Sequence, residues 1–157
     1  LPSFGIVVGN WVCAFLSDYL VKKGVSKTKI RTPLASIGLL LCGVGLYFAA
    51  TTPDRWLTVL WLTLALAALG FNMNSAWTSC TDLAGRFSGT VSGWMNFCGN
   101  LIGAAAPPVT AWVVTAYGWD SAILVTGLAG IIGAVIWQFV KPGQPLRHRY
   151  FVEAETK

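Results

Sequence analysis

Apolar positions along this chain form long unbroken runs rather than the alternating stripes of a water-soluble helix or strand. A helix rises about 1.5 Å per residue, so about 20 apolar residues cross the ~30 Å hydrocarbon core of a bilayer. Four of the uncharged runs are long enough, and the first is shorter. The pattern predicts five membrane-spanning helices, at about residues 1–17, 33–52, 56–76, 88–114 and 120–140.

Turn and breaker residues predict the connections. Residues 17–31 are expected to form a polar loop, and residues 51–55 a short turn in which Pro53 stops the helix. Pro33 is expected in the first turn of its helix, where a missing amide proton costs nothing. Short connections make successive helices antiparallel neighbours, which favours one domain over residues 1–140.

Two prolines are expected to break the fourth helix near its end, at Pro107 and Pro108. A terminator is the commoner role of proline there, and a kink used in gating is the alternative. Residues 141–157 form a tail, which we expect to be disordered from Pro142 onward because it lacks hydrophobic periodicity.

Composition strengthens the membrane interpretation. Hydrophobic residues make up 55% of the 157 positions and charged residues only 11%, against roughly 25% charged in a soluble domain. With so little polar surface, the chain is expected to have lipid as its solvent. The predicted fold class is all-α, in a polytopic membrane protein.

Basic residues indicate the orientation. Ten of the eleven fall in connections on one side of the membrane if the spans alternate, and Arg55 alone falls on the other. Since Lys and Arg are retained on the cytoplasmic side, we expect the C-terminus to be cytoplasmic. The basic residues lack interleaved aromatics, so the net charge of +5 gives no indication of nucleic-acid binding.

The chain begins at Leu1 rather than Met, and its first run lacks the basic segment and cleavage site of a signal peptide. We therefore expect the first run to be the tail of a truncated helix and the chain to be a fragment.

Small residues form two stripes suited to close helix packing. One joins Gly38, Cys42 and Gly45, and the other joins Gly127, Gly130 and Ala134. Four cysteines lie in or beside apolar runs without CxxC spacing or a paired histidine, which favours packing over a disulfide or metal site. They are Cys13, Cys42, Cys80 and Cys98.

The fourth apolar run carries the most informative polar pattern. Glycines, carboxamides and a proline recur there at intervals of four, three, four, three and four, which places them on one helical face. A carboxamide in hydrocarbon needs a partner or a water-lined cavity, so this face is expected to meet protein or an aqueous path. The six residues are Gly89, Gly93, Asn96, Asn100, Gly103 and Pro107.

Two interpretations of Asn96 and Asn100 remain open. They are either contacts for a substrate or hydrogen-bonding residues between neighbouring helices. The preceding run ends in a second polar face, where Trp77 is either a stacking surface for a hydroxylated substrate or an interfacial aromatic anchor. That face comprises Asn72, Asn74, Trp77, Thr78 and Thr81.

Catalysis has little support. The single His148 lies in the tail, the acidic residues fall at helix ends or in connections, and no nucleophile has a base within reach. The sequence indicates neither an enzyme nor a cofactor or metal site.

Residues 9–31 resemble the Gly-x3-Asp, Arg/Lys-rich loop motif of the major facilitator superfamily, in the copy that joins the eighth and ninth helices. Ala14 keeps the small residue of that motif, while Tyr19 replaces its usual arginine. The resemblance implies that this segment latches two helices on the cytoplasmic side in one conformational state. The latch residues would be Gly9, Asp18, Lys22 and Lys23.

The pattern Trp77-x4-Asp82, followed by the stripe from Gly89 to Pro107, resembles the tenth to twelfth helices of the anion:cation symporter family, which includes hexuronate, galactonate and glucarate permeases. Gly85 stands where such families often have proline. The chain would be the eighth to twelfth helices of a major facilitator bundle in a bacterial inner membrane, carrying a small organic anion with a proton by alternating access. The resemblance implies substrate contacts at Asn74, Trp77 and Asn96. From the stripe itself, Asn100 is a further candidate contact, and Gly89, Gly93, Gly103 and Pro107 are candidates for helix packing.

The N-terminal half of such a carrier, which would hold the basic anchor and the proton-coupling acids, is the expected partner, together with the lipid bilayer. Two alternatives stay open: a non-transporting membrane interaction protein that packs with a partner half, and a carrier of sugar phosphates or other solutes on the same fold.

Overall fold

The computed structural model describes residues 2–144 and contains only helices in that range. The all-α prediction is confirmed. Leu1 and residues 145–157, which hold most of the predicted tail and His148, lie outside the described part. The elements are α1 (Pro2–Lys22), α2 (Lys27–Thr51), α3 (Arg55–Ala84), the 3-10 turn η1 (Gly85–Phe87), α4 (Ser88–Tyr117) and α5 (Trp119–Trp137).

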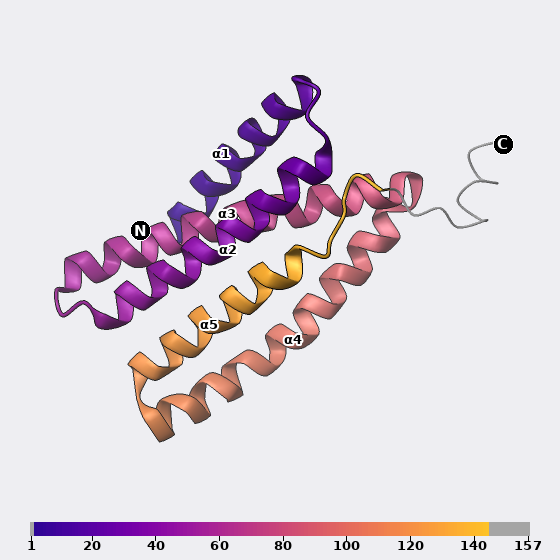
Figure 1. Ribbon diagram of the computed structural model, residues 1–157. Helices are drawn as coiled ribbons and strands as arrows, with labels where there is room; N and C mark the ends of the chain where they lie inside the picture. Colours follow the sequence, from indigo (N-terminus) through magenta and orange to yellow (C-terminus); the bar gives the residue numbers. More distant parts are fainter. Residues whose placement is uncertain (1, 145–157) are drawn as a thin grey trace.

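Helix α3 is the centre of the bundle. It packs along α1 on one side and α2 on the other, and α5 packs on α2 (Figure 1). The side chains that fill the α2–α3 contact are small, with Cys42, Ala65 and Ala68 buried together. Helix α4 touches α3 and α5 only lightly, and Val113 is its one fully buried residue. Helices α1, α2, α3 and α5 are therefore tightly packed, and α4 is loosely packed against them.

Glycines allow the close approach of α1, α2 and α3. A Cβ atom at Gly9 would overlap the carbonyl oxygen of Ala67, and one at Gly70 would lie 2.6 Å from the Ile6 oxygen. In α2, a Cβ at Gly38 would lie 2.6 Å from the Ala68 oxygen. Since a Cβ atom cannot approach backbone so closely, glycine is required at these crossings.

The predicted small-residue stripes are confirmed as packing surfaces. Gly45 packs on Ala65 of α3, while Gly127 of α5 lies against the backbone of Gly43 in α2. Ala134 is buried as well. Three of the four cysteines, Cys13, Cys42 and Cys80, are buried, and Cys98 is half-buried.

The connections differ from prediction at three places. Residues 17–31 are mostly helical, so the non-helical connection is only residues 23–26. Pro33 lies inside α2, because the polar residues from Lys27 onward add more than one turn in front of it. The break predicted at Pro107 and Pro108 is wrong: α4 continues through both to Tyr117.

The turn between α2 and α3 follows the prediction around Pro53. Helix α2 ends at Thr51, and the Asp54 carboxylate caps α3 by accepting hydrogen bonds of 2.9 Å from the backbone N–H groups of Trp56 and Leu57. Side-chain caps of this kind satisfy amides that a helix start leaves unpaired.

The chain reverses direction between α3 and α4 at Gly85, which has a positive φ of 51°. Proline cannot adopt that angle, because its ring fixes φ near −65°. A proline at position 85 would not fit this turn, which accounts for the departure from the proline found in the family that the chain resembles. The turn at Gly85 directs α4 back along the bundle (Figure 1).

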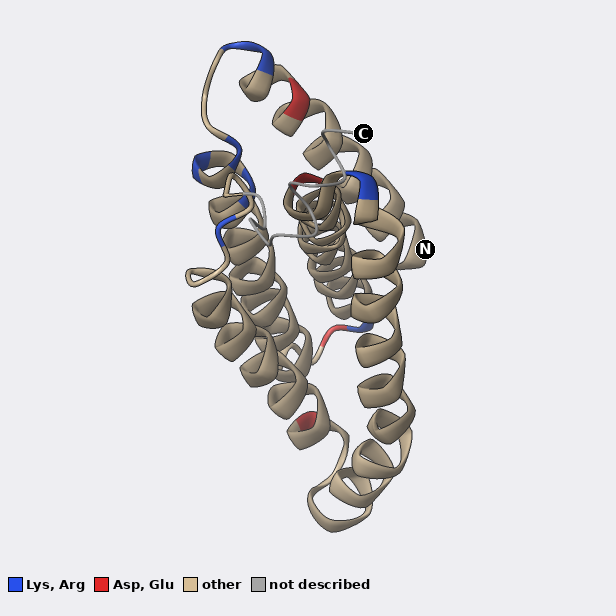
Figure 2. Cartoon of the chain, turned by 90° about the vertical axis from the view of Figure 1, so that its right-hand side faces the viewer, with Lys and Arg blue, Asp and Glu red and all other residues tan. Residues whose placement is uncertain are grey.

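Within residues 2–144, four helical segments are long and apolar enough to cross a membrane, and one of them, Arg55–Tyr117, contains both α3 and α4. Most Lys and Arg residues of this range gather toward one end of the bundle, as Figure 2 shows. The helices extend beyond several of the predicted spans, whose membrane boundaries stay predictions.

Candidate functional site

The polar stripe of α4 faces open space in this chain. A Cβ atom added at Gly89, Gly93 or Gly103 would meet nothing within 4 Å, and both Asn96 and Asn100 are exposed. The two carboxamides bond along their own helix, where Asn100 Nδ2 donates to the Asn96 backbone oxygen at 2.8 Å and to Asn96 Oδ1 at 3.1 Å. No helix of residues 2–144 covers the stripe, so the packing role predicted for its glycines stays a prediction about a partner.

A second exposed face of α4 is apolar and aromatic. Trp94, Leu101 and Trp112 are between 62% and 68% exposed. Each residue advances about 100° around a helix, so Leu101 points well away from its neighbour Asn100. The helix therefore separates a carboxamide face from a face suited to lipid.

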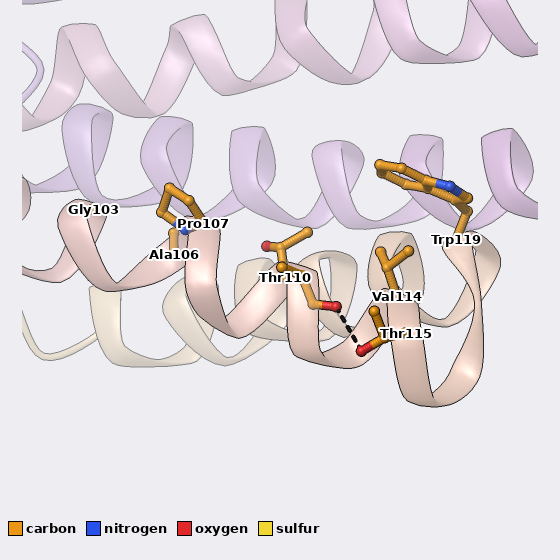
Figure 3. A pocket seen from close by; sticks show the side chains of 8 residues that line it. Gly103, Ala106, Pro107, Thr110, Val114, Thr115 and Trp119 are labelled. Carbon is orange, nitrogen blue, oxygen red and sulfur yellow. Dashed lines mark hydrogen bonds between the residues drawn. The ribbon is translucent and has the colours of Figure 1, made fainter.

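A hollow of about 640 Å³ continues the polar stripe toward the end of α4. Gly103 and Pro107 of the stripe form its floor with Thr110 and Val114, and Trp119 from the start of α5 closes one end (Figure 3). Its lining is mostly apolar, and the Thr115 hydroxyl donates within its own helix to the Ala111 oxygen. The hollow can hold an apolar body but offers few polar contacts.

The second predicted polar face, on α3, is only partly exposed. Trp77 is 43% exposed, whereas Asn74 is half-buried and its backbone oxygen accepts from the Thr78 hydroxyl at 2.7 Å. Within residues 2–144, neither Asn74 nor Trp77 bonds to Asn96 or Asn100. The structure therefore does not join the two faces into one contact set, and the four substrate contacts stay predictions.

Of the four predicted latch residues, Gly9 is the only one in tight contact with another helix. Asp18, Lys22 and Lys23 are exposed, and the Lys23 ammonium lies 4.6 Å from the centre of the Tyr19 ring. Asp18 makes no ion pair among the described residues, although its charge acts on Arg31. A latch through Asp18 remains a prediction about another conformational state.

The ion pairs at this end are made instead by Asp82, near the end of α3. Its two carboxylate oxygens pair with Lys27, at 2.7 Å, and with Arg31, both from the first turns of α2. Arg31 also donates to the Thr78 backbone oxygen at 2.5 Å. The side chains of Arg31 and Asp82 are only 9% and 11% exposed, so this cluster is a largely buried link between α2 and α3.

Sequence comparison decides the family. The model of the Major Facilitator Superfamily matches residues 1–107, about two thirds of the chain. The chain belongs to the Major Facilitator Superfamily. Together with its apolar helices, this makes it an integral, multi-pass membrane protein.

Several relatives of this major facilitator chain are named as transporters. The D-galactonate transporter of Escherichia coli O6:H1 is 30% identical over 86% of the chain and 31% of its own length. The probable anion transporter 4 of rice chloroplasts is 26% identical over 87% and 22%, and a probable sulfoacetate transporter of Cupriavidus necator is 27% identical over 90% and 33%. The chain thus spans between a fifth and a third of the length of these relatives.

The Asp82 cluster of this major facilitator chain is the feature that sequence reasoning missed. Its signal was present: Arg31 stands two residues before Pro33 at the head of an apolar helix, and Asp82 ends another such helix. The acid at the end of one helix could have been paired with the basic residues at the start of a neighbouring helix. A second missed feature is Asn72, whose side-chain nitrogen is buried without a hydrogen-bond partner in the described part of the chain.

Proposed function

We propose that this chain supplies the eighth to twelfth helices of a secondary transporter that carries small organic anions, such as hexuronate, galactonate or glucarate, together with protons. The observation that carries the proposal is the uncovered stripe of α4. A helix that keeps two asparagines and three glycines on an open face, and aromatic residues on another, is suited to line a path between two halves of a carrier.

Relatives support the anionic substrate. One is named for D-galactonate and another for sulfoacetate, and both are small organic anions. Asn96 and Asn100 offer neutral donors and acceptors for hydroxyl or carboxylate groups, and Trp77 offers a stacking surface with one N–H donor. The charged anchor for the anion and the acids that carry the proton belong, in this proposal, to an N-terminal half.

Orientation and mechanism follow from the same scheme. The end that carries the Asp82 cluster and Lys22, Lys23 and Lys29 would face the cytoplasm, which places the C-terminus there as well, in a bacterial inner membrane. Transport would proceed by alternating access, with the two halves rocking about a central site. In one of the two states, Asp18 would complete the cytoplasmic latch.

Transport by a chimera tests the proposal. The matched third of the Escherichia coli D-galactonate transporter is replaced by residues 1–157, and uptake of labelled galactonate, glucuronate and glucarate is measured in cells that lack their own carriers. We expect uptake of at least one sugar acid. A protonophore, which dissipates the proton gradient, should abolish this uptake. The variant Asn96→Leu should lose uptake while its abundance in the membrane stays unchanged. Leu101→Ala, on the aromatic face of the same helix, is the matched control and should keep uptake.

Other outcomes distinguish the alternatives. Uptake of a labelled sugar phosphate, with no uptake of sugar acids, would replace the proposed substrate class. A chimera that inserts at normal abundance but transports none of these solutes would contradict the transport function. It would favour a membrane protein that packs with a partner without transporting.

A further inference from the structure

Three hydroxyl groups form a row on α2, at Thr28, Thr32 and Ser36, spaced four residues apart on one helical face. Each bonds to the segment that follows α5, residues 138–144. The Gly143 N–H donates to Thr28 Oγ1 at 2.7 Å, Thr32 Oγ1 donates to the Val140 oxygen at 2.9 Å, and Gln138 Nε2 donates to Ser36 Oγ at 2.7 Å. The bonds join residues more than 100 positions apart.

Burial shows that one face of this segment is packed on α2, although Phe139 on another face is 80% exposed. Thr32 and Ser36 are 6% and 3% exposed, and Pro142 is among the most deeply buried side chains of the described chain. A Cβ atom at Gly143 would lie 2.6 Å from Thr28 Oγ1, so the backbone here lies directly on α2. Figure 1 shows the segment, in yellow, running from α5 beside the first turns of α2. The disorder predicted from Pro142 onward is wrong for residues 142–144.

The same two turns of α2 are held on another face by the Asp82 cluster. Lys27 and Arg31, which pair with Asp82, each directly precede a hydroxyl of the row. Successive residues are about 100° apart around a helix, so the ion pairs and the hydroxyl bonds are made from neighbouring faces of the same two turns of α2. Movement of one face must disturb the other.

We propose that residues 138–144 form a strap that positions Arg31 on Asp82, with Thr28, Thr32 and Ser36 as its anchoring residues. The strap ties the end of α5 to the start of α2, and the ion pairs tie α2 to α3. The three helices therefore move as one unit at this end of the bundle, while within residues 2–144 neither α1 nor α4 bonds to the strap or to Asp82. The strap is a property of the chain itself and does not depend on the proposed transport.

Hydrogen exchange of the full 157-residue chain in lipid nanodiscs tests the strap, with the backbone amides between residues 30 and 34 as the readout, apart from Pro33, which has no N–H. In the variant Thr28→Val/Thr32→Val/Ser36→Ala, these amides should exchange at least about tenfold faster, because three bonds are lost. The matched control is Thr126→Val, whose hydroxyl bonds only to Ala122 in its own helix, and it should leave amides 30–34 unchanged. Unchanged exchange in the triple variant would overturn the strap.

A disulfide provides a test that cannot be ascribed to misfolding. A Cβ atom at position 143 would lie 3.6 Å from the Thr28 Cβ, within the range of a disulfide. In the Thr32→Val/Ser36→Ala background, Thr28→Cys with Gly143→Cys should oxidise readily and slow exchange at amides 30–34, and reduction should reverse this. Failure to oxidise, or oxidation without slower exchange, would contradict a docked strap.

The positioning role has its own readout. Asp82→Asn should speed exchange of amides 30–34 when the strap is intact but add little in the triple variant, because Arg31 is then already displaced. If the two effects simply multiply, the strap and the ion pair are independent, and the strap does not position Arg31.

Discussion

Glycines in two regions of this chain lie in opposite environments. Where α1 crosses α3, Gly9 and Gly70 bring the backbones into contact, and a side chain at either would overlap main-chain atoms. On α4, Gly89, Gly93 and Gly103 have nothing near them. Glycines on a helix therefore indicate a surface that another group can approach closely, but they do not indicate whether that group belongs to the same chain.

The largest effect is expected where the glycine contact is tightest. Gly9→Leu places a branched side chain against the Ala67 carbonyl and should lower the free energy of unfolding by about 3 kcal/mol, since an overpacked interface cannot relax without separating the helices. The measurement is unfolding in mixed micelles by titration with SDS. Wild-type stability in this variant would mean that α1 does not pack on α3 as described.

A smaller loss is expected from the ion pairs of the packed region. Asp82→Asn leaves Arg31 largely buried without its charged partner and should cost about 2 kcal/mol, less than for a fully buried pair because both side chains keep some exposure. Lys27→Gln removes the exposed partner and should cost under about 1 kcal/mol. Equal losses in the same SDS titration would show that Arg31 has no special role.

The sign should reverse on α4. Gly93→Ala meets no neighbour and replaces a poor helix former by a good one, so it should stabilise the isolated chain by up to about 1 kcal/mol. In the galactonate chimera the same substitution should lower uptake, because the open face then has to accommodate a partner or substrate. A destabilised isolated chain would show that α4 is already packed there.

The helices were predictable from sequence because a long apolar run in lipid has to pair its own backbone N–H and C=O groups, and a helix does so. The packing of Gly38 and Gly45 followed from their spacing, and the turn at Pro53 followed from its proline. The continuation of α4 through Pro107 was not predictable from local preference, because a membrane helix tolerates proline when surrounding groups satisfy the freed backbone carbonyl. Long-range pairs such as Thr32 with Val140 leave no signal in periodicity, since they depend on where the chain returns.

The candidate site was predictable only as a face. Periodicity placed Asn96 and Asn100 together, and the structure shows them bonded along one open side of α4. Periodicity could not predict where Trp77 lies relative to these two asparagines. The relative rotation of α3 and α4 depends on the turn at Gly85 and on sparse contacts such as that between Cys80 and Met95.

Water access along α4 tests the central claim most directly. Cys98 is replaced by serine, the buried Cys13, Cys42 and Cys80 are retained, and single cysteines are placed at positions 93, 96 and 100, with Leu101→Cys on the aromatic face as the control. In the galactonate chimera, a charged, membrane-impermeant thiol reagent should label positions 93, 96 and 100, and galactonate should protect position 93, where Asn96 is still present. Position 101 should react only with a lipid-soluble reagent. Equal labelling on both faces, or labelling of position 101 alone, would contradict a substrate path along this stripe.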